Sequence, residues 1–495
     1  MTSPPRDLST PVLDRAAGAL LGLATGDALG AGYEFRAPLT GDAEMIGGGL
    51  GNWAPGEWTD DTQMALCIAE VAATGELDPL SVAERFLGWF GDAPKDVGIQ
   101  TSEVLRSSSS ALDVPLRAAA RFAARPDASA GNGSLMRTSP VALAHLGDDD
   151  AIVRAAHEIS ALTHADPLAG EACAIWCIAI ARAVRGSNFD GVWEGVDMLP
   201  ASAQRRWAQW LHEAETKPPA SFTPNGFVVS ALQAAWSAIR QTPVPTDVPC
   251  LHLQHALHAA VRIGHDTDTV AAIAGALLGA RWGSTAIPLR WRALLHGWPG
   301  YRAKDLVRLA VLTARGGATD ELGWPAAEDV TNWYTSNYPI EPFVVQLVDD
   351  PGVVLGNAAS AVTAEADVVL SLCRMGTRPS PGASEAHELM VVDSPDVRHN
   401  ANLDFVLGDT ADAIVRWRDE GKTVFLHCAA GVSRTSAFAA AYLSKRLGIS
   451  GLSALERVTA CHPIADPNPG FLAALARIPR QEDRRPAWSD REHPP

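Results

Sequence analysis

The sequence is short of basic residues, and this shortage limits the partners that the protein can bind. Its 495 residues include 40 Lys and Arg against 57 Asp and Glu, which gives a formal net charge of −17. Binding to nucleic acid relies on clustered Lys and Arg that contact the phosphate backbone. The sequence contains no basic patch with interleaved aromatic residues. We therefore expect no nucleic-acid partner.

Export signals, disulfide patterns and clean apolar segments are also missing. The first residues, MTSPPRDLSTPVLDR, do not place a basic stretch before an apolar one. Seven scattered cysteines, an odd number, are not the pattern of a disulfide framework. The longest apolar stretches are interrupted by Asp27, Arg182 or Arg281 and fall short of the ~20 residues that a membrane span needs. We expect a cytoplasmic protein without a membrane partner.

What remains is a globular composition whose character changes once along the chain. With 47% hydrophobic and 20% charged residues the chain is globular, and its length exceeds a single ordinary core. Ala- and Leu-rich segments with helical periodicity give way to short β-rich runs between helices. The runs that we predict as strands are PGVVLGNAA, ADVVLSLC, HELMVVD and KTVFLHC. We predict an N-terminal tail at 1–13, an all-α domain at 14–312, a polar linker at 313–331, an α/β domain with a partly parallel sheet at 332–480 and a disordered tail at 481–495.

The first predicted helix carries a stripe of glycines. Gly18, Gly22, Gly26 and Gly30 follow one another at four-residue spacing. Glycine lowers helix stability, so the stripe predicts that another backbone or a ligand approaches this face closely.

Two Asp-rich clusters each precede an apolar helical run. Residues 57–66 read EWTDDTQMAL and residues 265–269 read HDTDT. One Ser, Thr or Asp at a helix start is explained as a cap. A second cluster about two hundred residues later suggests that the two are halves of one site. Carboxylates and hydroxyls without a converging thiol or imidazole are the ligands of a hard cation such as Mg²⁺ or Mn²⁺.

A glycine turn lies between the two clusters. In GNGSLMRTSP, residues 131–140, Gly131 and Gly133 permit a tight turn whose N–H groups could hold a phosphate. The alternative is a simple turn between helices.

Five motifs in this region resemble ADP-ribosylglycohydrolases. GALLGLATGDALGAGYE, WTDDTQMAL, GNGSLMRTSP, THADP and HDTDTVAAIAGALLGA occur in the order of that family, over roughly residues 14–300. The resemblance implies an all-helical domain with two Mg²⁺ or Mn²⁺ ions that hydrolyses the bond at C1 of the distal ribose of ADP-ribose. The ions would polarise the ribose hydroxyls and a water molecule for attack at an oxocarbenium-like centre.

The resemblance also implies roles for individual residues. Glu34 matches the acidic residue of a loop over the metals and would assist proton transfer. The implied metal ligands are Thr59, Asp60, Asp61, Asp266, Asp268 and Thr269. The implied substrate contacts are Asp27, Gly131, Asn132, Gly133, Ser134 and His164. For His164 a buried position at a helix end is an equal alternative.

A second motif lies in TVFLHCAAGVSRT, residues 423–435. An apolar strand ends in His427 and Cys428, and Arg434 opens the next helix. Loop N–H groups, including those of Gly431 and Ser433, together with the helix N-terminus would form an anion cradle that favours the thiolate. Arg434 can hold two phosphate oxygens. Cys428 would attack phosphorus and form a phosphocysteine.

This pattern resembles cysteine-dependent protein tyrosine phosphatases of the dual-specificity type, over about residues 335–480. The resemblance implies an Asp that protonates the leaving oxygen. Spacing favours Asp396, and Asp393 is the alternative. It also implies that His427 orients the loop and that Thr435 stabilises the departing thiolate. No cofactor is expected for this domain.

We therefore predict a bifunctional hydrolase that acts on an ADP-ribosylated protein or small molecule and on a phosphorylated substrate. The sequence leaves the ADP-ribosyl linkage open among arginine, serine, a nucleobase and a metabolite. The alternative is that one domain is a non-catalytic module that binds ADP-ribose or a phosphoprotein and directs the other to its target.

Overall fold

The computed structural model describes residues 7–338, 341–377 and 382–480. The chain forms two compact units, Met1–Glu321 and Leu322–Pro495. The division falls within the predicted linker at 313–331. The first helix begins at Thr10, inside the segment predicted as an N-terminal tail. The predicted disordered tail at 481–495 lies outside the described residues.

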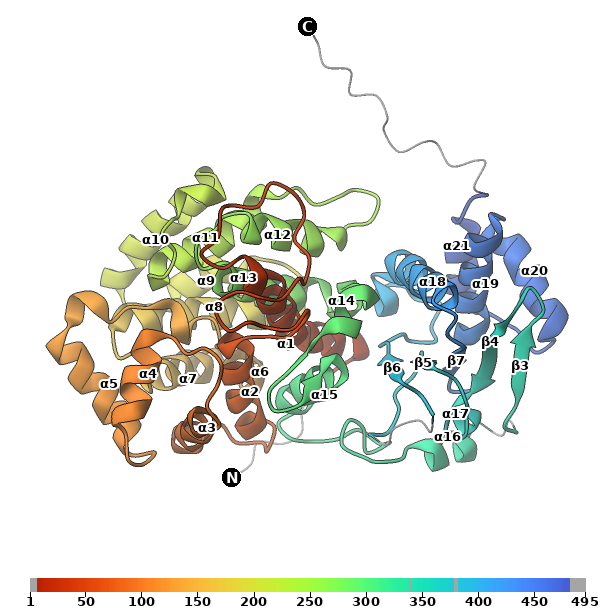
Figure 1. Cartoon of the computed structure of the whole chain (residues 1–495), viewed down its shortest axis with the longest axis horizontal. Coiled ribbons are helices and arrows are strands. Elements are labelled where there is room, and N and C mark those ends of the chain that lie inside the picture. Colours follow the sequence, from red (N-terminus) through yellow and green to blue (C-terminus); the bar gives the residue numbers. More distant parts are fainter. Residues whose placement is uncertain (1–6, 339–340, 378–381, 481–495) are drawn as a thin grey trace, which may run out of the picture. The chain divides into compact units, whose positions relative to one another are not determined.

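The first unit is built from helices (Figure 1). Its described residues contain one short antiparallel ribbon, β1 (His296–Gly297) and β2 (Tyr301–Arg302), in a region where we had expected no strand. The α-helices are α1 (Thr10–Gly30), α2 (Asp60–Ala72), α3 (Pro79–Gly91), α4 (Ile99–Ser107), α5 (Asp113–Ala124), α6 (Ser139–Ala144), α7 (Asp149–Ala161), α8 (Pro167–Gly186), α9 (Gly191–Asp197), α10 (Ala201–Thr216), α11 (Val228–Gln241), α12 (Leu251–Val261), α13 (Thr267–Trp282), α14 (Leu289–Leu294) and α15 (Ala303–Ala314).

Helices α1 and α13 pack backbone against backbone along the glycine stripe. A Cβ added to Gly22 would lie 2.3 Å from the carbonyl oxygen of Gly275, and one added to Gly26 would lie 2.0 Å from that of Ala271. At the end of the stripe, a Cβ on Gly30 would lie 2.5 Å from the Cα of Asp268. The predicted close approach of another backbone is therefore confirmed. It brings the end of α1 against the first turn of α13, where the second acidic cluster lies.

Helix α8 corrects one expectation from the sequence. We expected every apolar stretch to be too short for a membrane span, but this helix has 20 residues and a mean hydropathy of 1.5 in its most apolar window. By length and composition it could cross a membrane. However, 83% of that window is buried inside the fold. The helix therefore has the burial of a core helix.

The second unit contains a five-stranded sheet in the order β3-β4-β7-β5-β6. β3 (Val344–Leu347) pairs antiparallel with β4 (Asp350–Asn357), and the remaining neighbours are parallel. The other strands are β5 (Val368–Ser371), β6 (Glu385–Glu388) and β7 (Val424–Cys428). The α-helices are α16 (Thr331–Asn337), α17 (Ala358–Ala361), α18 (Leu403–Asp419), α19 (Arg434–Leu447), α20 (Gly451–Cys461) and α21 (Pro469–Ala476). The predicted partly parallel sheet is confirmed.

The sheet places the cysteine motif at the carboxyl end of its central strand. β5 and β7 are buried along their whole length, as expected of strands inside a parallel sheet. Ligands of such sheets bind beyond the carboxyl ends of the strands. The run HELMVVD was predicted as a strand at 387–393, but β6 ends at Glu388 and Leu389 donates the next backbone hydrogen bond to Ser371 (2.9 Å). Residues 390–393 leave the sheet and run past the end of β7.

Candidate active sites

Asp27, on α1, holds the start of α2. Its carboxylate accepts hydrogen bonds from the N–H of Thr59 (3.0 Å), from the N–H of Thr62 (3.0 Å) and from the hydroxyl of Thr62 (2.6 Å). An Asp on a neighbouring helix thus satisfies N–H groups that the start of α2 leaves unpaired. Burial raises the pKa of Asp27 to about 6, although these hydrogen bonds favour the ionised form. Because Asp27 supplies the cap, Asp60 and Asp61 are free to serve another purpose.

The two acidic clusters meet in the fold. Asp27, Asp61 and Asp268 place carboxylate oxygens within 4.8 Å of one another, and Glu34, Asp266 and Asp268 do the same. Asp268 belongs to both groups, an arrangement that suits two neighbouring cations. Within the described residues, the buried Oδ1 of Asp61 has no hydrogen-bond partner. A buried carboxylate oxygen without a donor fits a divalent cation with oxygen ligands.

Asp60 lies outside these two groups. Its Oδ2 accepts a hydrogen bond from the N–H of Gly98 (3.2 Å), at the start of α4. Burial, with the nearby charge of Asp96, raises its pKa to about 8. The structure therefore places Asp60 beside the cluster, where it faces the loop between α3 and α4.

Burial, followed by mutual repulsion, raises the pKa values of the carboxylates in this site. Burial, followed by the charge of Asp266, raises the pKa of Glu34 to about 8. Burial and neighbouring carboxylates raise the pKa values of Asp61 and Asp268 well above their usual range. Cations bound among these groups would remove the repulsion, so the donor set fits hard divalent ions.

Both predicted threonine ligands face Asp61. The hydroxyl of Thr59 donates to Asp61 Oδ2 (3.1 Å), and the hydroxyl of Thr269 lies 3.5 Å from the same oxygen. The two hydroxyls thus bring neutral oxygens next to the carboxylate whose other oxygen lacks a donor.

The glycine turn positions Asp266. The side-chain amide of Asn132 donates to Asp266 Oδ2 (2.7 Å), and the backbone N–H of Asn132 donates to the carbonyl of Gly226 (3.1 Å). Asn225, which the sequence did not single out, accepts from the N–H of Asp266 (3.0 Å). The hydroxyl of Ser134 is buried and accepts from Ser160 (2.9 Å). The N–H of Asn132, predicted to be available for a phosphate, is therefore already paired.

His164 packs against the same turn. A Cβ on Gly133 would lie 3.0 Å from His164 Cε1, and one on Gly131 would lie 3.3 Å from Nε2. The His164 Nδ1 lies 2.8 Å from the hydroxyl of Thr163, and burial lowers the pKa of the imidazole well below its usual range. These contacts favour the helix-end interpretation of His164, in which a neutral ring supports the turn.

Asp96 is a residue of this site that the sequence analysis missed. It lies in the loop between α3 and α4, is only partly buried and contributes to the raised pKa values of Glu34 and Asp60. Its neighbour Lys95 pairs with Glu57 at 2.6 Å. No Lys, Arg or His in the described part of the chain forms an ion pair with Asp96. A single Asp in a loop without a repeated pattern gave no signal in the sequence.

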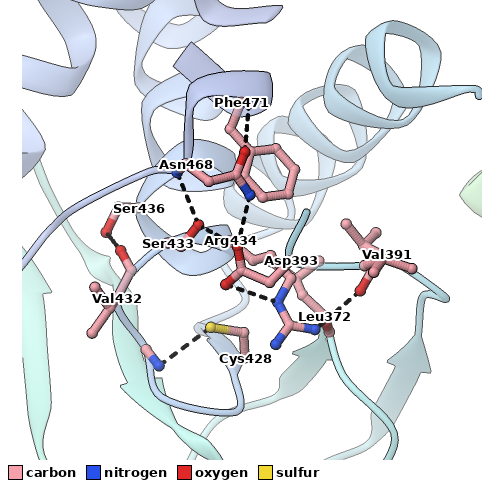
Figure 2. A network of polar contacts seen from close by, with 12 residues as sticks. Leu372, Val391, Asp393, Cys428, Val432, Ser433, Arg434, Ser436, Asn468 and Phe471 are labelled. Atoms are coloured by element: carbon pink, nitrogen blue, oxygen red, sulfur yellow. Dashed lines mark hydrogen bonds and ion pairs between the residues drawn. The ribbon is translucent and has the colours of Figure 1, made fainter. Parts of the chain in front are cut away.

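In the second unit, a tight loop joins β7 to α19 and encloses the thiol. Cys428 ends β7, and its sulfur accepts a hydrogen bond from the N–H of Gly431 (3.2 Å). Gly431 has a φ of 77°, and a Cβ there would lie 2.5 Å from the ring of Phe343, so the turn requires glycine. Arg434 begins α19, and its Nη1 donates to the carbonyls of Leu372 (2.7 Å) and Val391 (3.0 Å). These bonds fix the guanidinium in the same site as the thiol (Figure 2).

The two candidate acids of this unit occupy different environments. Asp393 Oδ1 accepts from the hydroxyl of Ser433 (2.7 Å), and its Oδ2 lies 3.8 Å from Nε of Arg434 (Figure 2). Asp396 instead begins the 3₁₀-helix Val397–Asn400 and pairs with the exposed Arg398 at 2.6 Å. The contact with Arg398 lowers the pKa of Asp396. The geometry therefore favours Asp393, against the preference that spacing gave to Asp396.

His427 and Thr435 lie behind the loop. His427 Nε2 lies 2.7 Å from the hydroxyl of Ser371, and burial lowers its pKa to about 4, so the ring is neutral. The hydroxyl of Thr435 is buried and has no hydrogen-bond partner within the described residues. It therefore remains available to a group inside the loop.

A loop before α21 braces the thiol loop, and the sequence did not reveal it. His462 Nε2 lies 2.9 Å from the carbonyl of Gly431, and Asn468 donates from its backbone to the hydroxyl of Ser433 (3.1 Å) and from its side chain to Asp393 Oδ1 (2.7 Å). The only sequence signal was Asn-Pro-Gly at 468–470, which predicts a helix start and not a contact with an active site.

Comparison with known proteins gives two family matches. Residues 8–321 match the model of the ADP-ribosylglycohydrolases, and residues 357–481 match that of the dual specificity phosphatase catalytic domain. "ADP-ribosylarginine hydrolase Tri1" of Pseudomonas putida (strain GB-1) is 32% identical over 288 residues, which cover 56% of this chain and 73% of that protein. "ADP-ribosyl-[dinitrogen reductase] glycohydrolase" of Rhodospirillum rubrum is 32% identical over 57% of this chain and 91% of its own length.

One solved structure aligns with part of this chain. Human DUSP28 aligns with a TM-score of 0.25 and 28% identity, over 28% of this chain and 93% of that one.

Proposed function

The chain belongs to the ADP-ribosylglycohydrolase family, and from this premise we propose that its first unit releases ADP-ribose from a modified target in a reaction that depends on divalent cations. The second family match is also to a family of hydrolases, so the chain carries two hydrolase domains. The observation that supports the metal dependence is the buried, donor-free Oδ1 of Asp61 between the two acidic clusters. The relatives are named as hydrolases, and these names do not support the alternative of a binding module.

The residues of the first site would serve two purposes, as metal ligands and as a group that transfers a proton. The carboxylates of Asp61, Asp266 and Asp268, with Asp60 beside them, would hold Mg²⁺ or Mn²⁺, and Thr59 and Thr269 would add neutral oxygens. When bound, such ions stabilise negative charge that develops on oxygen. Burial and the neighbouring carboxylates raise the pKa of Glu34 to about 8 in the protein without metal. Glu34 would assist proton transfer to the leaving group as the glycosidic bond breaks.

We infer an arginine linkage from Asp96. A partly buried carboxylate without a cationic partner suits a guanidinium, which it can bind through two parallel hydrogen bonds. A serine linkage would place no positive charge there. The name of the Pseudomonas putida relative, an ADP-ribosylarginine hydrolase, supports this choice among the four linkages that the sequence left open.

The test is release of free ADP-ribose from arginine-, serine- and nucleobase-linked substrates with Mg²⁺, with Mn²⁺ and with chelator. We expect the protein to release ADP-ribose from the arginine-linked substrate only when metal is present. The Asp268→Ala variant should not release ADP-ribose. Asp190→Ala, which removes an exposed carboxylate, is the matched control. Full activity of Asp268→Ala would refute the metal assignment. Calorimetric binding of ADP-ribose without turnover in any metal would instead support a binding module.

For the second unit we propose hydrolysis of phosphate monoesters. Cys428 attacks phosphorus, so that an S–P bond forms while the P–O ester bond breaks. Asp393 transfers a proton to the departing oxygen, and Arg434 holds the phosphoryl oxygens. Water then attacks the phosphocysteine and releases phosphate and the thiolate, towards which the hydroxyl of Thr435 is free to donate. The contacts of Asp393 with Ser433 and Arg434 support this assignment.

Hydrolysis of an aryl phosphate by the full chain tests this proposal. Cys428→Ser should abolish turnover and leave ADP-ribose release unchanged, because the two sites lie in separate units. The surface variant Asp412→Asn serves as control, since this side chain is 55% exposed. Equal turnover by Cys428→Ser and by the wild type would exclude a phosphocysteine.

A further inference from the structure

Asn468 joins the last helix of the second unit to the acid and the thiol loop. Its side-chain Nδ2 donates to Asp393 Oδ1 at 2.7 Å, and its backbone N–H donates to the hydroxyl of Ser433 at 3.1 Å. That hydroxyl in turn donates to Asp393 Oδ1 at 2.7 Å. The three residues therefore form a closed network in which one carboxylate oxygen accepts two hydrogen bonds (Figure 2).

The orientation of the Asn468 amide is fixed by the helix that it begins. Its Oδ1 accepts from the N–H groups of Gly470 (2.9 Å) and Phe471 (3.2 Å), as the N-cap of α21. A helix N-terminus offers donors alone, so the oxygen must face α21 and the NH₂ group must face Asp393. The amide cannot be reversed without breaking both sets of bonds.

Helix α21 is itself held firmly in the unit. The ring of Phe471 is fully buried and meets Phe438 of α19 edge to face, with 6.4 Å between ring centroids. A Cβ on Gly470 would lie 3.1 Å from the Cα of Pro395, so the start of α21 also touches the segment that carries Asp393. Because α21 is fixed in this way, the Asn468 side chain at its start can hold Asp393 in one place.

We propose that Asn468 is a positioning residue, which holds Asp393 so that Oδ2 is the oxygen that carries and transfers the proton. This inference rests on the proposed phosphatase function. With Ser433 and Asn468 both donating to Oδ1, that oxygen has little remaining capacity for a proton. Oδ2, 3.8 Å from Arg434 Nε, is the oxygen directed towards the guanidinium that would hold the phosphoryl group. During P–O cleavage, the proton passes from Oδ2 to the leaving oxygen.

The test compares substrates that differ in their need for an acid. Phenyl phosphate has a basic leaving group that must be protonated, whereas 2,4-dinitrophenyl phosphate has a leaving group that departs unaided. Asn468→Ser retains a good N-cap for α21 but is too short to reach Asp393. We expect this variant to lower kcat for phenyl phosphate roughly ten-fold and to change kcat for the dinitrophenyl ester less than about two-fold.

Two further readouts separate positioning from a structural role. Loss of a donor to the carboxylate should move the basic limb of the kcat/KM profile upward by about 0.5–1 pH unit, because the anion is less stabilised. Combining Asn468→Ser with Asp393→Asn should give no loss beyond that of Asp393→Asn alone.

Each outcome is decisive. Equal losses on both substrates, with an unmoved pH profile, would overturn the positioning role and leave Asn468 as a helix cap alone. If the wild type turns over neither ester, the proposed phosphatase function fails. If Asp393→Asn affects both esters equally, the assignment of Asp393 as the acid fails, and Asn468 has no proton donor to position. Circular dichroism of Asn468→Ser checks that the unit is folded.

Discussion

Replacement of Asp60 by Asn should stabilise the first unit in the absence of metal and weaken its stabilisation by metal. Asp60 is buried at the start of α2, and its carboxylate meets the charges of Asp96, Asp27 and Asp266. Asn has nearly the same shape, cannot ionise and retains an oxygen that accepts from the N–H of Gly98. The substitution thus removes a charge that is unfavourable in the metal-free protein and that we propose contributes to metal binding.

The sign of the pH effect follows from the shifted pKa. The pKa of Asp60 is about 8 in the folded, metal-free protein, and an unperturbed Asp has a pKa of about 4. Between these values the folded state keeps a proton that the unfolded chain has lost, so stability falls as the pH rises from about 4 towards 8. At pH 7 the loss amounts to at most about 4 kcal/mol in the free energy of unfolding, because the neighbouring carboxylates titrate together with Asp60. Asp60→Asn should abolish this loss.

The assay is urea denaturation in chelator at several pH values. Unfolding is monitored by hydrogen exchange of peptides from α2, which report on the first unit alone. We expect Asp60→Asn to exceed the wild type by up to about 4 kcal/mol at pH 7, with the difference vanishing near pH 4. Added Mg²⁺ or Mn²⁺ should stabilise the wild type by about 2.7 kcal/mol at one hundred times the dissociation constant, and the variant by less. A variant that is less stable than the wild type in chelator at pH 7, or equally stabilised by metal, would refute the reasoning.

Three further predictions concern metal uptake, the acid and the thiol loop. Because the pKa of Asp60 is about 8, metal binding at pH 7 should release protons and tighten as the pH rises from 6 to 8; calorimetry in buffers of different ionisation enthalpy measures this, and a pH-independent affinity would contradict it. Asp393→Asn should lower kcat for phenyl phosphate by roughly 100-fold and Asp396→Asn by less than about two-fold, and the reverse order would restore Asp396 as the acid. Gly431→Ala, whose Cβ would meet Phe343 at 2.5 Å, should destabilise the second unit by about 1–3 kcal/mol in thermal unfolding and leave ADP-ribose release unaltered.

The groups that we propose carry the chemistry could be found in the sequence because they stand at the ends of regular elements. Asp60 and Asp268 lie in the first turns of α2 and α13, and Cys428 ends β7 directly before α19. At such places a polar residue interrupts an apolar period, and the interruption is visible in a linear pattern. The same reasoning located β4, β5 and β7, whose apolar runs are buried in the sheet.

The groups that hold this chemistry in place could not be found in this way. Asn225 reaches Asp266 across 41 residues, and Asn468 reaches Asp393 across 75. Such contacts depend on how elements pack, which no local period encodes. Spacing favoured Asp396, whereas the geometry favours Asp393, because a residue count ignores the path of the chain. This Asp accepts from the N–H of Arg398 (2.9 Å) and begins a 3₁₀-helix, so its carboxylate is already engaged away from the thiol.

Both sites fix their acidic groups through the start of a helix. Asp27 bonds the first N–H groups of α2, which sets the direction in which Asp60 and Asp61 leave the first turn. Asn468 bonds the first N–H groups of α21, and its amide then holds Asp393. N–H groups of a first turn keep their direction because the rest of the helix holds them, so a side chain bonded to them is held as well. Charged groups oriented in this way need little rearrangement during the reaction. A substitution that removes the bonds to the helix start, such as Asp27→Ala or Asn468→Ala, should therefore alter the free energy of unfolding and the rate together, whereas Cys428→Ser removes the nucleophile and should alter mainly the rate.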